Sequence, residues 1–176
     1  MPSSWTSTTF SVRWSVAEHA VVNSSPLIFL TRGGLLDLLQ LVALEIVVPS
    51  AVANEILRRG PSDPAARALT SVSWLRVVET PEVPPAIQAW DLGPGESAVL
   101  SWCVARPGVE AIIDDLGARR CAQAIAVHVR GTLGLVLLGK QRGQLTSARA
   151  VLEALRNTGM YLSDSVMNRA LKMVGE

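Results

Sequence analysis

Two adjacent carboxylates, Asp114 and Asp115, follow the short apolar run at residues 111–113. Such a run is typical of a buried strand in a parallel sheet, and the residues after it have the composition of a helix. Open α/β sheets bind their ligands at the carboxyl ends of strands, which is where this pair lies. One Asp is enough to cap a helix, and two side by side repel each other. The pair therefore indicates either a helix cap with an incidental neighbour or part of a binding site.

Three other oxygen-bearing side chains occupy comparable positions in the chain. Asn23 ends a predicted strand at 20–23, Glu55 lies within a predicted helix, and Glu96 begins a helix after Gly-Pro-Gly. Carboxylate and amide oxygens with no His or Cys nearby favour hard ions such as Mg²⁺ or Mn²⁺. Each residue alone also has a structural interpretation, Glu55 as a solvated helix residue and Glu96 as a charge that complements the helix dipole.

Short apolar strands alternate with helices along the whole chain. The predicted strands are 20–23, 46–48, 74–78, 111–113 and 129–132, and the predicted helices include 35–44, 50–59, 96–105, 115–127, 135–142, 147–157 and 163–174. This alternation predicts a three-layer α/β/α sandwich with a mostly parallel sheet. We divide the chain into an N-terminal extension, 1–20, and a single domain, 21–176.

Composition narrows the class of protein further. The chain of 176 residues is 49% hydrophobic, but it has no apolar stretch near the ~20 residues that span a bilayer, so we expect a soluble, cytoplasmic protein with no membrane association. Cys103 and Cys121 lie on apolar helix faces and are expected to be buried thiols. Residues 1–115 contain 12 acids and 7 bases, whereas residues 116–176 contain 3 acids and 9 bases. An acidic cluster against a basic surface suits a metal site beside a phosphate-bearing ligand, and scattered solvated charge is the alternative.

Several of these segments resemble the motifs of one family. Residues 21–28, Val-Val-Asn-Ser-Ser-Pro-Leu-Ile, resemble the opening motif of the PIN-domain nucleases. Glu55 in Val-Ala-Asn-Glu-Ile, Gly-Pro-Gly-Glu at 93–96 and the segment 113–120 are similar to later motifs. Gly-Thr-Leu-Gly at 131–134 resembles a PIN-like branch described as the toxins of type II toxin–antitoxin pairs. The resemblance extends from residue 21 to the C-terminus.

The resemblance implies hydrolysis of RNA by a ring of acidic side chains that binds Mg²⁺ or Mn²⁺. It assigns catalysis to Glu55, Glu96, Asp114 and Asp115, and metal binding to Asn23, Glu96, Asp114 and Asp115. Of the adjacent pair we favour Asp114 as the ligand, because it ends the strand. Ser25 lies near the ring, and Arg119 and Arg120 follow it by one helical turn and could face the RNA backbone. Solvated or salt-bridged arginines are the alternative.

The first position of the ring departs from the family. PIN nucleases commonly have Asp where this chain has Asn23, and an amide oxygen can bind a metal but brings no charge. The alternative function is therefore a catalytically weak or inactive PIN-like module that binds RNA or an antitoxin. A phosphatase on a related sheet is disfavoured, because the chain has no Asp-x-Asp motif at a strand end.

The resemblance also implies a small antitoxin as a protein partner. We expect in addition a homodimer, on account of an apolar segment of the chain. The segment 35–42 is apolar around most of the predicted helix, more than one core-facing side requires, so we expect it to form the interface, together with the final helix.

Overall fold

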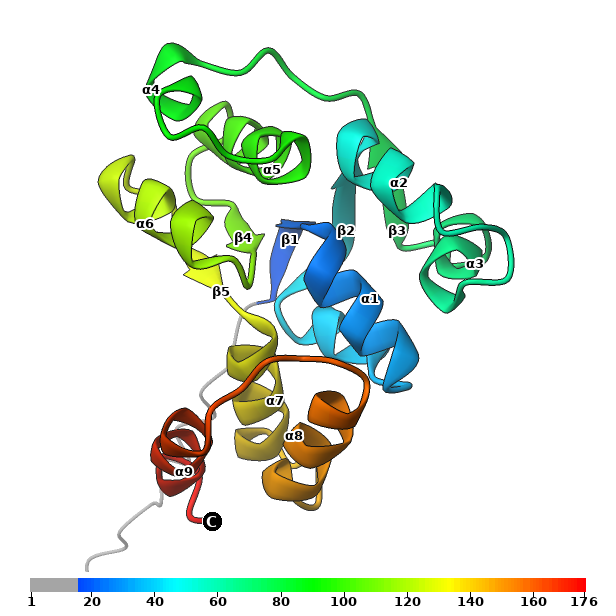
Figure 1. Ribbon diagram of the computed structural model, residues 1–176, viewed down its shortest axis with the longest axis vertical. Helices are drawn as coiled ribbons and strands as arrows, with labels where there is room; N and C mark the ends of the chain where they lie inside the picture. The colour runs from blue at the N-terminus through cyan, green and yellow to red at the C-terminus, as the bar shows by residue number, and fades with distance from the viewer. Residues whose placement is uncertain (1–15) are drawn as a thin grey trace, which may run out of the picture.

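A five-stranded parallel sheet forms the centre of the computed structural model, which describes residues 16–176 (Figure 1). The strands are β1 (Ala17–Val22), β2 (Ala43–Pro49), β3 (Leu75–Val78), β4 (Glu110–Ile112) and β5 (Val129–Arg130), in the spatial order β3-β2-β1-β4-β5. All four strand pairs are parallel. The predicted α/β class is confirmed.

Helices connect the strands and cover the sheet. They are α1 (Ser24–Arg32), the 3₁₀ helix η1 (Leu36–Leu41), α2 (Ser50–Leu57), α3 (Pro64–Ser71), α4 (Pro85–Gln88), α5 (Pro94–Val104), α6 (Leu116–Ala124), α7 (Thr132–Gln141), α8 (Ala148–Asn157) and α9 (Asp164–Lys172). The helix α5 packs against β1, β2 and β4, and α7 contacts both α8 and α9. These last three helices lie together near the C-terminus (Figure 1).

The strand order reverses between β1 and β4. The chain adds β2 and β3 on one side of β1, and then crosses to the other side for β4 and β5. Val22 pairs with Ile112 in the register of these two central strands, and both side chains are fully buried. The residues that follow β1 and β4 therefore emerge side by side at the carboxyl edge of the sheet. In open α/β sheets this reversal is the usual place for a ligand.

The apolar segment after α1 differs from its prediction. The expected helix 35–44 is replaced by η1 and by the start of β2 at Ala43. Ala43 is fully buried and Leu44 is 66% exposed, which is the alternation of a strand. In η1, Leu38 and Leu39 are buried in the protein's own core. The apolar character of 35–42 is thus explained within one chain, and it no longer supports an interface at this segment.

Smaller differences concern where elements begin and end. A short helix, α4, that was not among the predicted elements begins at Pro85, because proline is favoured in the first turn. The helix α6 ends at Ala124, and Ala126 has a φ of 57° that a helix cannot continue through. The helix α7 begins at Thr132, so β5 is only Val129–Arg130.

The two cysteines and the N-terminal segment complete the comparison with the sequence. Cys103 and Cys121 are free and buried as predicted, and burial raises the pKa of the Cys103 thiol to about 12. The strand β1 begins at Ala17, within the predicted extension 1–20, and residues 1–15 of that extension lie outside the described residues. From residue 16 onward, no helix is both long and apolar enough to cross a membrane.

A single carboxylate joins the helices near the C-terminus. The Glu176 side chain accepts hydrogen bonds from the backbone N–H groups of Ala148 and Arg149, at 2.8 and 3.0 Å, at the start of α8. Ser147 Oγ donates to it at 3.0 Å, and Lys140 Nζ of α7 lies 3.0 Å away. These contacts lower the pKa of Glu176 to about 2, and the hydrogen bond from the Arg149 N–H has the largest effect. The ionised carboxylate therefore stabilises the packing of α7 against α8.

We expect Glu176→Gln to lower the melting temperature at pH 7. The pKa is depressed from an ordinary value of 4.5 to about 2, so the stabilisation is fully present above pH 4.5 and is lost as the pH falls towards 2. The difference in melting temperature between wild type and variant should therefore narrow over that range, as circular dichroism would measure. Glu153→Gln, at an exposed position of α8, is the matched control. A difference that does not change with pH would contradict this role.

Candidate functional site

Asn23 lies at the centre of the carboxyl edge of the sheet. It follows β1, its side chain is 1% exposed, and its backbone N–H donates to Ile112 O of β4 at 3.0 Å. Its Nδ2 donates to Glu96 Oε1 at 2.8 Å. Its Oδ1 is buried and accepts no hydrogen bond from the described residues. A buried oxygen without a donor is costly, so the position calls for a hydrogen-bond donor or a cation.

Glu55 reaches the same cluster from α2. Its Oε1 accepts a hydrogen bond from the backbone N–H of Gly95, in the first turn of α5, at 3.2 Å. A Cβ atom on Gly95 would lie 2.9 Å from Asn23 Oδ1 and 2.9 Å from Glu55 Oε1, closer than carbon and oxygen can approach without displacement. Glycine is therefore required for the three elements to meet, and Asn23, Glu55 and Glu96 lie in one cluster around the start of α5.

Asp114 is held by a different contact. Thr132, fully buried at the start of α7, donates its backbone N–H to Asp114 Oδ1 at 2.7 Å and its hydroxyl to Oδ2 at 2.6 Å. Burial raises the pKa of Asp114 above its ordinary value, although the two Thr132 hydrogen bonds and the charge of Arg119 act in the opposite direction. Asp114 is thus a well-oriented carboxyl group whose ionised form is disfavoured by its surroundings.

Asp115 has a different environment from its neighbour. It is exposed, it occupies the N-cap position of α6, and its Oδ1 accepts from the Ala118 N–H at 2.8 Å. The two carboxylates therefore do not share one role in the fold. Asp115 caps a helix, and Asp114 is fixed between β4 and α7.

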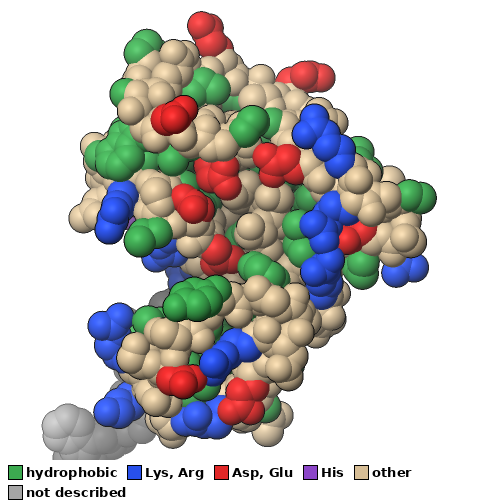
Figure 2. Space-filling model, in the orientation of Figure 1, with side chains coloured by type: hydrophobic (Ala, Val, Ile, Leu, Met, Phe, Trp, Pro, Cys, Tyr) green, Lys and Arg blue, Asp and Glu red, His purple; other side chains and the backbone are tan. Residues whose placement is uncertain are grey.

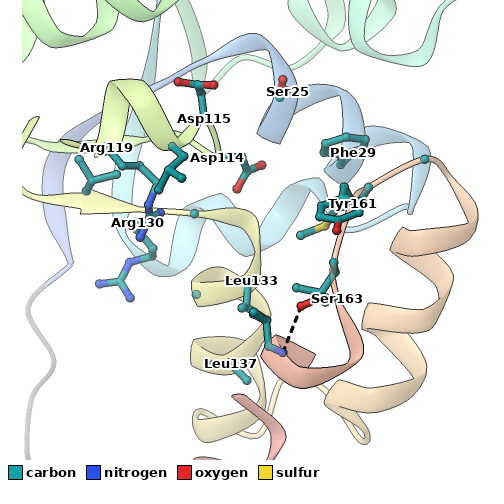
Figure 3. A pocket seen from close by; sticks show the side chains of 18 of the residues that line it. Ser25, Phe29, Asp114, Asp115, Arg119, Arg130, Leu133, Leu137, Tyr161 and Ser163 are labelled. Atoms are coloured by element: carbon teal, nitrogen blue, oxygen red, sulfur yellow. Dashed lines mark hydrogen bonds between the residues drawn. The ribbon is translucent and has the colours of Figure 1, made fainter. Parts of the chain in front are cut away.

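A cleft of about 930 Å³ opens over this edge of the sheet (Figure 3). Of the residues singled out from the sequence, it is lined by Ser25, Glu96, Asp114, Asp115 and Arg119. Asn23, Glu55 and Arg120 do not line it. Figure 2 shows acidic side chains gathered over the middle of this face, above a hollow that separates them from the helices near the C-terminus. The predicted ring is thus divided between an exposed part and a buried part.

Arg119 contacts the site and Arg120 does not. Arg119 Nη1 donates to the backbone oxygen of Ile113 at 3.2 Å, directly before Asp114. Arg120 is exposed on α6 outside the cleft. Arg130 was not predicted as a site residue, yet it lines the cleft while it forms an ion pair with Glu110 at 3.0 Å.

The oxygen groups fit a hard cation in their chemical type. Asn23 Oδ1 is a buried acceptor that lacks a donor, and Glu96 and Asp114 supply carboxylates near the same strand ends. Across residues 16–176, however, no three His, Cys, Asp or Glu side chains lie close enough together to hold an ion between them. The central position belongs to an amide, so the site offers fewer charges at short range than a ring of four carboxylates would.

Sequence reasoning missed the residues that orient the acids. Thr132 was predicted only as the end of a strand within Gly-Thr-Leu-Gly, and Gly95 only as part of the Gly-Pro-Gly before Glu96. Tyr161 was not considered, although it lines the cleft and is 93% exposed. A Thr that follows a β-strand at the same edge as an Asp is a signal that could have identified Thr132.

In comparisons with known proteins, residues 19–176 match a family model described as a PIN domain. The search of curated proteins found no match to the chain.

We expect Asp114→Asn to be more stable than the wild type at pH 7 in the absence of divalent ions. The folded-state pKa of Asp114 lies above its ordinary value of 3.8, so ionisation costs stability as the pH rises from that value through the folded pKa. Asn keeps an acceptor for the Thr132 N–H and gains a donor for the Thr132 hydroxyl. In thermal melts, the variant should have a higher melting temperature than the wild type at pH 7, and this difference should disappear at pH 3. A variant less stable than wild type at both pH values would exclude desolvation as the main influence on Asp114.

Proposed function

The chain belongs to the PIN domain family, a family with a nuclease fold, and we propose that it hydrolyses RNA phosphodiester bonds with the help of Mg²⁺ or Mn²⁺. We further propose that it is the toxin of a toxin–antitoxin pair. The observation that carries the proposal is the unpartnered buried oxygen of Asn23, beside Glu96, at the carboxyl edge where the strand order reverses.

Three residues would hold the ion in this proposal. They are Asn23, through its buried Oδ1 behind the cleft, and Glu96 and Asp114, which line the cleft together with the exposed Asp115. A bound Mg²⁺ or Mn²⁺ would lower the pKa of a water molecule and neutralise charge that develops on the phosphate.

The remaining contacts would keep these ligands in position. Asn23 Nδ2 orients the Glu96 carboxylate, and Thr132 orients Asp114 through both of its oxygens. Glu55 binds the Gly95 N–H, which fixes the first turn of α5 and with it Glu96. In this proposal Glu55 is a positioning residue for Glu96, and orientation of this kind typically affects activity by about 10–100-fold.

The RNA backbone would lie along the cleft. Ser25 and Arg119 line it on either side of Asp114, and Arg119 supplies a positive charge next to the carboxylates (Figure 3). Arg120 lies outside the cleft, so its predicted contact with RNA has no structural support.

A binding module without strong activity is the second candidate. The neutral amide at Asn23 and the spacing of the carboxylates both favour weak metal binding. In this case the cleft would bind RNA or an antitoxin without cleavage. An antitoxin, which the family resemblance supports, and a second copy of the chain remain proposed partners in both cases.

The test of the first candidate is cleavage of single-stranded RNA. We expect cleavage with Mg²⁺ or Mn²⁺ and none after addition of EDTA. Glu96→Gln and Asp114→Ala should each reduce the rate by about a hundredfold or more, because a metal site contributes several kcal/mol and each 1.36 kcal/mol is tenfold in rate. Glu82→Gln, at an exposed carboxylate outside the cleft, is the control. Activity that survives EDTA would exclude the metal mechanism, and binding of RNA without cleavage would favour the second candidate.

A second test restores the missing charge. We expect Asn23→Asp to bind Mn²⁺ at least about tenfold more tightly than the wild type. A tenfold change in affinity corresponds to ~1.4 kcal/mol, and the Coulomb attraction between a carboxylate and the ion at a partly buried site exceeds that value. Without metal the variant should melt at a lower temperature, since it replaces the donor to Glu96, now at 2.8 Å, with a second carboxylate. Asn54→Asp, the same change at an exposed position of α2, is the control. Equal Mn²⁺ affinity in calorimetric titrations of wild type and Asn23→Asp would mean that residue 23 is not a ligand.

A further inference from the structure

Tyr161 is exposed in an unusual way for an aromatic residue. It lies between α8 and α9, lines the cleft, and at 93% is the most exposed of the large hydrophobic side chains from residue 16 onward. Its neighbours Met160 and Leu162 are both 8% exposed and pack into the core. The segment is therefore anchored on both sides of Tyr161, and the ring is held towards solvent by its buried neighbours.

A second aromatic residue lies beside it in the cleft. Phe29 of α1 lines the same wall, and Figure 3 shows Phe29 and Tyr161 together on one side of Asp114. On the other side of Asp114 lie Arg119 and Arg130. The cleft thus has a charged end and an aromatic end, with the carboxylate between them.

We propose that Tyr161, supported by Phe29, is a stacking site for an unpaired nucleobase of the bound RNA. This inference rests on the proposed ribonuclease function and adds to it a residue that would bind a base. Each base presents a flat face that stacks on an aromatic ring, and the phosphate beside it would lie towards Arg119 and Arg130. Bases within a duplex are already stacked and cannot offer that face.

The charged end of the cleft favours a nucleotide over an apolar protein segment. A protein segment that covered Tyr161 and extended along the cleft would also cover Asp114, Asp115 and Arg119, and burial of charged groups without matched partners is costly. A nucleotide joins an anionic phosphate to an apolar ring within one residue. That combination matches the two ends of the cleft.

The experiment measures RNA affinity separately from cleavage. Fluorescence anisotropy of a labelled single-stranded oligoadenylate, with Ca²⁺ in place of Mg²⁺ and Mn²⁺, would compare wild type with Tyr161→Ala, Tyr161→Leu and Tyr161→Phe. We expect Tyr161→Ala to weaken binding about tenfold or more, and Tyr161→Leu to do so nearly as much, because stacking needs a π-face. Tyr161→Phe should bind like wild type. Leu44→Ala, at a residue 66% exposed on β2 and outside the cleft, should also bind like wild type.

The outcomes separate this inference from the function on which it rests. If the wild type binds no RNA of any kind, both are wrong. If wild type and Tyr161→Ala bind single-stranded RNA equally, stacking is wrong and the proposed function stands. Stacking would also be wrong if Tyr161→Ala lost as much affinity for a duplex of matched sequence as for single-stranded RNA. The same holds if Tyr161→Leu kept the full affinity of the wild type. Loss of self-association in Tyr161→Ala with unchanged RNA affinity would identify a protein-docking surface instead.

Discussion

The buried amide of Asn23 joins three elements that are distant in the sequence. Its backbone N–H bonds to the end of β4, and its side-chain nitrogen bonds to Glu96 at the start of α5. The amide oxygen has no donor among the described residues, which costs about 1–3 kcal/mol for a buried group. A site built around this group is therefore stabilised by whatever positive partner enters it, and a carboxylate in the same place would add repulsion to Glu96.

The arrangement of this site depends on side-chain oxygens that pack closely against glycine backbone, as well as on charge. Gly95 leaves room for the oxygens of Asn23 and Glu55, and Gly131 leaves room for Asp114 Oδ1, which a Cβ atom would approach to 2.9 Å. The acidic side chains thus pack against main chain that carries no side-chain atoms. The parallel order of β1 and β4 then brings the two groups to one edge.

The strands, and the placement of Asn23 and Asp114 at their carboxyl ends, could be predicted from the sequence, because buried parallel strands are short continuous apolar runs that end in polar residues. Asn23 and Asp114 were recognisable for that reason. The segment 35–44 was not predictable by period, since an apolar run with no polar side fits a helix, a 3₁₀ turn and a strand equally. The contact of Thr132 with Asp114 spans 18 residues and depends on how β4 pairs with β5. Tyr161 was missed because its exposure follows from the burial of its two neighbours, which only the packing determines.

Thr132 has a consequence for communication within the molecule. It is the first residue of α7, and Leu133 and Leu137 of the same helix line the far wall of the cleft. A displacement of α7 would move this wall together with both hydrogen-bond donors of Asp114. It would therefore change the affinity of that carboxylate for a proton. Thermodynamic linkage requires the reverse effect to have the same size, so an occupant at Asp114 must change the affinity of the wall by an equal factor.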